Sequence, residues 1–251
     1  MTSRRALKTN QQNRRDFLQA AGTVVAAALA GNLPFAALAQ TSTKMKIGTL
    51  GSGRVGSAIG AAWVKAGHEV MFSSLDLEAN KKLAASLGAG ARAGTPREAA
   101  AFGDVLLVSV PYTALPGLGR DLGDLIKGKI VIDTSNPIVA RDGDMAVAAR
   151  AKGAGIASME FLPGARIVRA FNAIGAARMA EAASKSERVG MPIAGDDPNA
   201  ISVASALVRD AGYEPVLVGT LAAMGKYLVP GTPLAGERSP EEIRKVAAAL
   251  K

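Results

Sequence analysis

The sequence contains no cysteine and one histidine, His68, among its 251 residues. The lack of cysteine excludes a disulfide framework, thiol catalysis and cysteine-based zinc sites. It does not exclude an oxidising compartment, because a well-packed domain of this length needs no cross-links. One histidine also disfavours a histidine-ligated metal site and a Ser-His-Asp triad. The position of His68 in "KAGHEV" is typical of a solvated turn between a helix and a strand.

Aromatic residues are scarce, at 4%, and the formal net charge of +9 is not gathered into a Lys/Arg block. Basic and aromatic residues therefore do not interleave in the way that favours stacking on bases, and we expect no nucleic-acid partner. A mildly basic surface instead suits a small molecule that carries phosphate.

Long uninterrupted hydrophobic runs are missing as well. The apolar run before residue 40 is broken by glycine, asparagine and proline at positions 31, 32 and 34, so we expect no stable membrane span. It follows "RRDFL" at residues 14–18 and ends in "ALA" at residues 37–39, an order that resembles a twin-arginine (Tat) signal peptide. Residues 1–39 are therefore predicted to be a Tat-type signal, with the twin-arginine export machinery as a partner and a periplasmic or exported location. The alternative is a membrane anchor formed by an uncleaved signal.

From Met45 onward, apolar strand-like runs alternate with alanine-rich helical stretches. The runs are continuous rather than alternating, as expected for strands covered by helices on both faces. We predict an α/β fold with a Rossmann-like, doubly wound, mostly parallel sheet, in a single domain with a short C-terminal extension. The domain spans residues 45–251, with a dinucleotide-binding core over about 45–140 and an acceptor-side half over about 141–251.

The expected strands are "MKIGTL", "EVMFSS", "DVLLVSV", "KIVIDTS", "RIVRAFN", "RVGMPIAG" and "EPVLVG". The expected helices are Val55–Lys65, Leu77–Leu87, Pro96–Phe102, Tyr112–Ile126 and Asn199–Ala211, the last capped by Asp197.

A glycine motif, Gly51-x-Gly53-x-x-Gly56, lies between the first expected strand and the first expected helix. In a dinucleotide site the first glycine permits a tight turn, the second lets backbone approach the pyrophosphate, and the third lets helix pack on strand. Ser52 could add a hydroxyl and Arg54 a positive charge. The alternative is a strand-to-helix turn that binds no ligand.

The end of the second strand bears on the choice between NADP and NAD. An NAD site usually ends this strand with an acidic residue that holds the ribose 2′-hydroxyl. Here the strand ends at Ser73-Ser74, and Asp76 is better placed to cap the following helix. We therefore expect NADP rather than NAD, with Arg54, Lys81 or Lys82 supplying charge.

These segments resemble the coenzyme F-420 (deazaflavin)-dependent NADP oxidoreductases, whose fold is shared by the reductase domain of the STEAP metalloreductases. The resemblance rests on "IGTLGSGRVGSAIGAAWVKAGHEVMFSS", "DVLLVSVPY", "KIVIDTSNP", "RIVRAFNAIGAARM" and "MPIAGDD", and so covers most of the chain after residue 45.

The resemblance implies a set of binding residues. Ser52, Gly53, Arg54 and Val55 would hold the pyrophosphate, and Ser73 and Ser74 the 2′-phosphate region. Val110, Pro111 and Tyr112 would flank the nicotinamide, and Asn136, Pro137, Ala170 and Asn172 would line the cleft for the second substrate. Leu75 departs from the family, which commonly has arginine there.

The predicted function is hydride transfer between NADP(H) and a flavin- or deazaflavin-like acceptor. Such a transfer needs alignment more than an acid or base, so no catalytic residue is assigned. One alternative is an NADP-dependent imine or ketone reductase, although the chain after Val189 continues as strand and helix rather than as a large helical domain. Another is a non-catalytic dinucleotide-binding module. The oligomeric state stays open, with a homodimer as one option.

Overall fold

One sheet of eight strands organises the part of the chain that the computed structural model describes, residues 44–179 and 188–250. The predicted signal peptide, residues 1–39, lies outside these residues. The strands follow the order β3-β2-β1-β4-β5-β6-β7-β8, and every neighbouring pair is parallel except β6 and β7. Their bounds are β1 (Lys46–Leu50), β2 (Glu69–Ser73), β3 (Ala91–Ala93), β4 (Val105–Val108), β5 (Ile130–Asp133), β6 (Arg166–Arg169), β7 (Gly190–Gly195) and β8 (Glu214–Gly219). The predicted Rossmann-like, mostly parallel α/β fold is confirmed.

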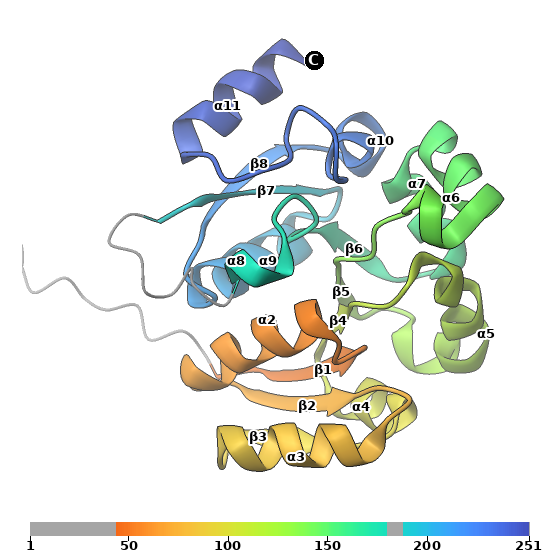
Figure 1. The fold of residues 1–251 in the computed structure, drawn as a ribbon, viewed down its shortest axis with the longest axis vertical. Coiled ribbons are helices and arrows are strands. Elements are labelled where there is room, and N and C mark those ends of the chain that lie inside the picture. Colours follow the sequence, from red (N-terminus) through yellow and green to blue (C-terminus); the bar gives the residue numbers. More distant parts are fainter. Residues whose placement is uncertain (1–43, 180–187, 251) are drawn as a thin grey trace, which may run out of the picture. The chain divides into compact units, whose positions relative to one another are not determined.

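Helices connect the strands and cover both faces of the sheet (Figure 1). Their bounds are α2 (Arg54–Lys65), α3 (Leu77–Leu87), α4 (Pro96–Phe102), α5 (Leu115–Ile126), α6 (Val139–Lys152), α7 (Ala154–Phe161), α8 (Ala176–Met179), α9 (Pro198–Asp210), α10 (Leu221–Met224) and α11 (Pro240–Ala249). Short 3₁₀ turns, η2 (Tyr112–Ala114) and η4 (Gly225–Tyr227), precede α5 and follow α10. None of these helices is long and apolar enough to cross a membrane.

Two hydrophobic clusters lie on opposite faces of the sheet, and the strands alternate between them. Leu107 and Ile132 belong to the cluster beneath α2 and α9, whereas Leu106 and Val131 belong to the one that α5 and α11 cover. In the central strands β4 and β5 every position is therefore buried on one face or the other, which explains their continuous apolar runs in the sequence. Burial of a side chain of this size contributes about 2 kcal/mol.

Two aspartates cap helices as the sequence predicts. Asp76 accepts a hydrogen bond from the Ala79 N–H (2.9 Å) and begins α3, and Asp197 accepts one from Ala200 (2.7 Å) and begins α9. The position of α3 fixes the end of β2 at Ser73, directly before the loop that a dinucleotide ribose would approach.

The expectation of a solvated His68 is wrong. Its side chain is buried: Nδ1 accepts a hydrogen bond from the Met45 N–H (3.2 Å), and Nε2 lies 3.0 Å from Asp210 Oδ2. The ring thus joins the residue before β1 to the end of α9, because α9 packs beside α2 rather than leaving this turn open to solvent.

The strand order reverses direction between β1 and β4. The chain moves from β1 outward to β2 and β3, and then returns to add β4 on the other side of β1. In open α/β sheets the crevice at such a point, at the carboxyl ends of the strands, is where ligands bind.

Candidate functional site

The turn after β1 can be formed only with glycine at its first position. Gly51 has φ +103, and a Cβ there would lie 2.2 Å from the Ser109 carbonyl oxygen. Its N–H donates to the Ser73 carbonyl oxygen (3.0 Å), so the turn also closes against the end of β2. A left-handed backbone and a close carbonyl together exclude any larger residue.

The other two motif glycines have different surroundings. A Cβ on Gly56 would lie 2.0 Å from the Gly51 carbonyl oxygen, so this glycine lets α2 pack against the turn. A Cβ on Gly53 would meet nothing within 4 Å, and its φ of −70 suits any residue. The fold itself therefore does not require glycine at position 53.

The start of α2 is suited to phosphate. Gly53 is the N-cap and offers no side-chain cap, and the first turn contains no acidic residue. The first N–H groups of a helix have no partner within the helix, and the helix dipole favours an anion beside them. The open space beside Gly53 and the amides at the start of α2 suit a phosphate group, so the predicted role of Gly53, Arg54 and Val55 in holding a pyrophosphate stays a prediction.

The serines near the end of β2 are engaged with the protein itself. Ser52 Oγ donates to the Ser73 carbonyl oxygen (3.0 Å), and Ser73 Oγ donates to the Thr49 carbonyl oxygen (2.5 Å) within the core. Ser74 Oγ is half-buried and lies 3.1 Å from Asn80 Oδ1. These hydroxyls join β1 to β2 and to α3, whereas the Leu75 side chain is fully exposed beside them.

A cleft of about 490 Å³ opens at the carboxyl ends of β4, β5 and β6 and reaches the start of α2. Seven of the predicted site residues line it: Gly53, Arg54, Val55, Val110, Pro111, Asn136 and Asn172. The ionisable side chains among its described lining residues are Arg54 and Arg141. Within residues 44–179 and 188–250, no cluster of acidic and histidine side chains could hold a metal ion.

Tyr112, expected beside the nicotinamide, turns its side chain away from this cleft. The ring is fully buried and meets Phe161 edge to face, 6.0 Å between centroids. Its hydroxyl donates to the Ala154 carbonyl oxygen (2.9 Å), and burial raises the pKa of Tyr112 to about 12. Ala170 and Pro137 are also buried and do not line the cleft.

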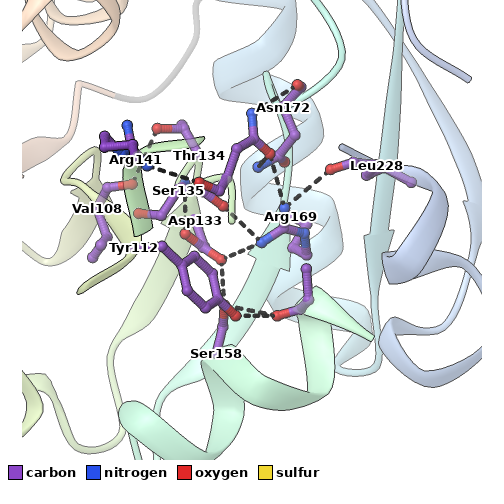
Figure 2. Close-up of polar contacts among 12 residues, drawn as sticks. Val108, Tyr112, Asp133, Thr134, Ser135, Arg141, Ser158, Arg169, Asn172 and Leu228 are labelled. Atoms are coloured by element: carbon purple, nitrogen blue, oxygen red, sulfur yellow. Dashed lines mark hydrogen bonds and ion pairs between the residues drawn. The ribbon is translucent and has the colours of Figure 1, made fainter. Parts of the chain in front are cut away.

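A buried ion pair lies beneath the β5–β6 end of the cleft (Figure 2). Asp133 ends β5 and Arg169 ends β6, and Arg169 Nη1 lies 2.6 Å from Asp133 Oδ2 with neither side chain exposed. Asp133 Oδ2 also accepts from Ser158 Oγ (2.8 Å), and Oδ1 accepts from the Ser135 N–H (2.8 Å). The carboxylate has a donor on each oxygen, which offsets much of the cost of burying its charge.

Arg169 carries this network toward the cleft. Its Nη2 donates to Asn136 Oδ1 (3.3 Å) and to the Leu228 carbonyl oxygen (3.0 Å). Asn136 Nδ2 in turn donates to the Asn172 carbonyl oxygen (3.0 Å). The buried pair thus fixes the orientation of Asn136 and holds the two asparagines of the cleft together.

Strained backbone follows β6. Phe171 has φ +63, a left-handed conformation that bulky residues rarely adopt. Such strain costs about 1–3 kcal/mol and persists only where packing enforces it. The ring is held edge to face between Trp63 (6.2 Å) and Tyr213 (5.9 Å), and the turn that results brings the next residue, Asn172, to the cleft.

Arg141 and a C-terminal loop are cleft residues that the sequence did not predict. Pro230, Gly231 and Ala235 line the cleft, and the Gly236 N–H donates to the Ala173 carbonyl oxygen (2.8 Å). No local motif marks this loop as part of a site, because its contacts with the rest of the cleft are long-range, as is the nearby hydrogen bond from Arg169 to the Leu228 carbonyl oxygen.

The sequence model of the family described as NADP oxidoreductase coenzyme F420-dependent matches residues 46–137. That segment contains β1 to β5, the glycine turn and Asn136. The match supports an NADP-dependent oxidoreductase.

Solved structures show the same fold over more of the chain. Hypothetical protein SMa0349 from Sinorhizobium meliloti is 26% identical, with a TM-score of 0.68 over 80% of this chain and 97% of that one. A proposed F420-dependent NADP reductase from Arthrobacter sp. FB24 is 19% identical, with a TM-score of 0.61 over 74% and 90%. An imine reductase from Myxococcus stipitatus, in complex with NAD+, is 19% identical with a TM-score of 0.53; the match covers 83% of this chain and 60% of that one.

Proposed function

We propose that the protein transfers a hydride between NADP(H) and a flavin- or deazaflavin-like acceptor. The observation that carries this proposal is a cleft of about 490 Å³ that begins at the open glycine turn and continues past Val110 to the two asparagines. The cleft therefore joins the glycine turn, where the dinucleotide would bind, to the asparagines, where the acceptor would bind.

The side chains of the cleft align reactants rather than exchange protons. The amides at the start of α2 would hold the pyrophosphate, and apolar Val110 and Pro111 would support a flat ring. NADPH, when bound, supplies the hydride. Closeness and orientation of two rings are sufficient for such a transfer, so the proposal needs no carboxylate or histidine, and none is among the described residues that line the cleft.

The end of β2 favours NADP over NAD. No carboxylate ends the strand, and Asp76, the nearest acidic side chain in the sequence, is engaged as the cap of α3. A 2′-phosphate would therefore meet less repulsion here than at an NAD site, where an acidic residue ends the strand.

An NADP-dependent imine or ketone reductase is the second candidate, because imine reductases share this fold. In this chain, β7 and β8 follow β6 and extend the sheet, with α9 between them. This part of the chain therefore continues the sheet rather than forming a large helical domain, which disfavours the second candidate. A non-catalytic dinucleotide-binding module is the third candidate.

Nicotinamide absorbance can separate the three. The full chain is mixed with NADPH and, in parallel, with a flavin, a deazaflavin or a cyclic imine, and NADPH binding is measured by calorimetry. We expect oxidation of NADPH with a flavin or deazaflavin. Oxidation with the imine alone would establish the second candidate, and tight binding without any oxidation would establish the third.

We also propose export by the twin-arginine route, which the "RRDFL" segment and the following small-residue cleavage site support. This route is associated with proteins that fold before export, so a cofactor could be loaded beforehand. Expression in a bacterium with N-terminal sequencing of the periplasmic fraction should give a chain that begins at Gln40. Replacing Arg14 and Arg15 with lysine should retain the precursor in the cytoplasm, and unchanged processing would contradict the route.

A further inference from the structure

The charge of the cleft is positive and uneven. Arg54 is the first residue of α2 and belongs to the end assigned to the pyrophosphate. Arg141 lies in the first turn of α6, after β5, where the acceptor would bind. No aspartate or glutamate is among the described residues that line the cleft. The acceptor end therefore presents a guanidinium that the dinucleotide site does not explain.

The Arg141 guanidinium is fixed in place before any ligand arrives. Its Nε donates to Asp142 Oδ1 (2.8 Å), and its Nη2 donates to Asp142 Oδ2 (2.8 Å) and to the Asn136 carbonyl oxygen (2.9 Å). The Asp142 side chain has no exposed surface, and its Oδ2 also accepts from the Ile138 N–H (2.9 Å). The Arg141 hydrogen bonds hold the pKa of the Asp142 carboxyl below its usual range, so the carboxylate stays ionised and keeps its hold.

These contacts use one edge of the guanidinium. None of the hydrogen bonds that Arg141 makes with Asp142 and Asn136 involves its Nη1 atom. In addition, 43% of the Arg141 side chain is exposed. A planar guanidinium with free N–H groups matches the oxygens of a phosphate or carboxylate. Because the side chain is already ordered, binding such an anion would cost little further rotamer entropy.

We propose that Arg141 binds an anionic substituent of the acceptor and that the second substrate is therefore an oxyanion-bearing molecule, with a phosphate ester or a carboxylate. This inference rests on the proposed function, because it names the class of acceptor for the same cleft. It favours a phosphorylated flavin or deazaflavin over its neutral analogue.

The test compares ligands that share one ring and differ in charge. FMN is compared with riboflavin for the phosphate, and a flavin with a carboxymethyl side chain is compared with lumiflavin for the carboxylate. Dissociation constants are measured by flavin fluorescence with NADP+ present, and KM is measured with NADPH. The wild-type chain is expected to bind the anionic member of one pair about 10- to 100-fold more tightly, as for a charge-assisted hydrogen bond. The pair that shows this preference identifies the anion.

Three variants locate the preference. Arg141→Gln should reduce the ratio within the pair to about one, and Arg141→Lys should restore only part of it, because lysine keeps the charge but not the fork. Arg141→Gln also leaves the buried Asp142 carboxylate without its partner, which could destabilise the protein. The double variant Arg141→Gln/Asp142→Asn removes that buried charge and is measured in case the single variant does not fold. Arg97→Gln is the control, since Arg97 also pairs with an aspartate, Asp124, but lies on α4 outside the cleft.

The outcomes are distinguishable from those of the proposed function. Charge-selective binding that depends on Arg141 but gives no NADPH oxidation supports an anion site at Arg141 and overturns the proposed function. Equal binding of charged and neutral flavins overturns the inference even if both are reduced. Loss of NADP+ affinity in Arg141→Gln, with an unchanged flavin ratio, assigns Arg141 to the dinucleotide and also overturns it.

Discussion

The β1–α2 end of the cleft is shaped by a glycine turn and carries the Arg54 side chain, whereas a network of buried side chains shapes its β5–β6 end. At the first end, three glycines set a tight turn, an open space and a close helix contact. At the second end, a buried ion pair orients two asparagines, and an ordered arginine lies at the cleft. Backbone amides suit the phosphates that all dinucleotides share, while side chains distinguish one acceptor from another. If the proposed hydride transfer takes place in this cleft, we expect the β5–β6 end to determine acceptor specificity.

The largest expected effect comes from breaking the buried pair. Arg169→Met leaves Asp133 charged and without its cation in the core, and should lower the free energy of unfolding by about 3–5 kcal/mol. Urea denaturation measures the loss. Asp133→Asn/Arg169→Met should recover much of it, because no net charge then stays buried. A single variant as stable as the wild type would show that side chains do not hold this end together.

The glycine end should respond in binding rather than in stability. Gly53→Asp places a carboxylate beside the pyrophosphate site and should weaken NADPH binding at least about 100-fold, or about 2.7 kcal/mol. Aspartate is a favourable N-cap residue, so the melting temperature should not fall. Calorimetric titration and thermal melting test both statements.

Gly56→Ala is the matched control within the same motif. Its Cβ would lie 2.0 Å from a carbonyl oxygen, so it should reduce stability, which Gly53→Asp should not. If both variants melted alike, the division of tasks among the three glycines would be refuted.

The dinucleotide preference should change at the end of β2. Ser74→Asp adds a carboxylate beside the exposed Leu75 and should shift the ratio of NADP to NAD affinity by about tenfold toward NAD. The ratio of kcat/KM for the two cofactors measures this shift. An unchanged ratio would place the 2′-phosphate elsewhere.

The smallest effect is expected at Tyr112. Tyr112→Phe removes the hydrogen bond to the Ala154 carbonyl oxygen and should cost about 1 kcal/mol of stability. Because the ring does not line the cleft, kcat should stay within about twofold of the wild-type value. A large fall in kcat with normal stability would return Tyr112 to the nicotinamide site.

The parts of the fold that depend on local patterns could be predicted from the sequence. Continuous apolar runs predicted seven of the eight strands, and Asp76 and Asp197 marked the starts of two helices. The edge strand β3 was missed because "ARA" contains no apolar run. Helix α7 was missed because its buried residues are alanine, glycine and serine, which give no clear hydrophobic period.

In the candidate site, too, the features that depend on local sequence could be predicted, and those that depend on long-range contacts could not. The glycine turn is a local motif, so its position followed from the sequence. The pairing of Asp133 with Arg169 joins residues 36 positions apart and leaves no local signal. In the sequence, Arg141 cannot be distinguished from a surface arginine, because its contacts with Asp142 and Asn136 exist only in the folded chain. The direction of the Tyr112 ring likewise depends on its packing against Phe161.

Trp63 is the one tryptophan in the sequence, so its fluorescence comes from a single known position in the structure. Its indole is buried, donates to the Leu207 carbonyl oxygen (2.7 Å) and touches the edge of strained Phe171, whose neighbour Asn172 lines the cleft. A ligand that relaxes this backbone would alter the surroundings of a single fluorophore. We therefore expect the emission of Trp63 to report ligand binding at the proposed acceptor end of the cleft without an added label.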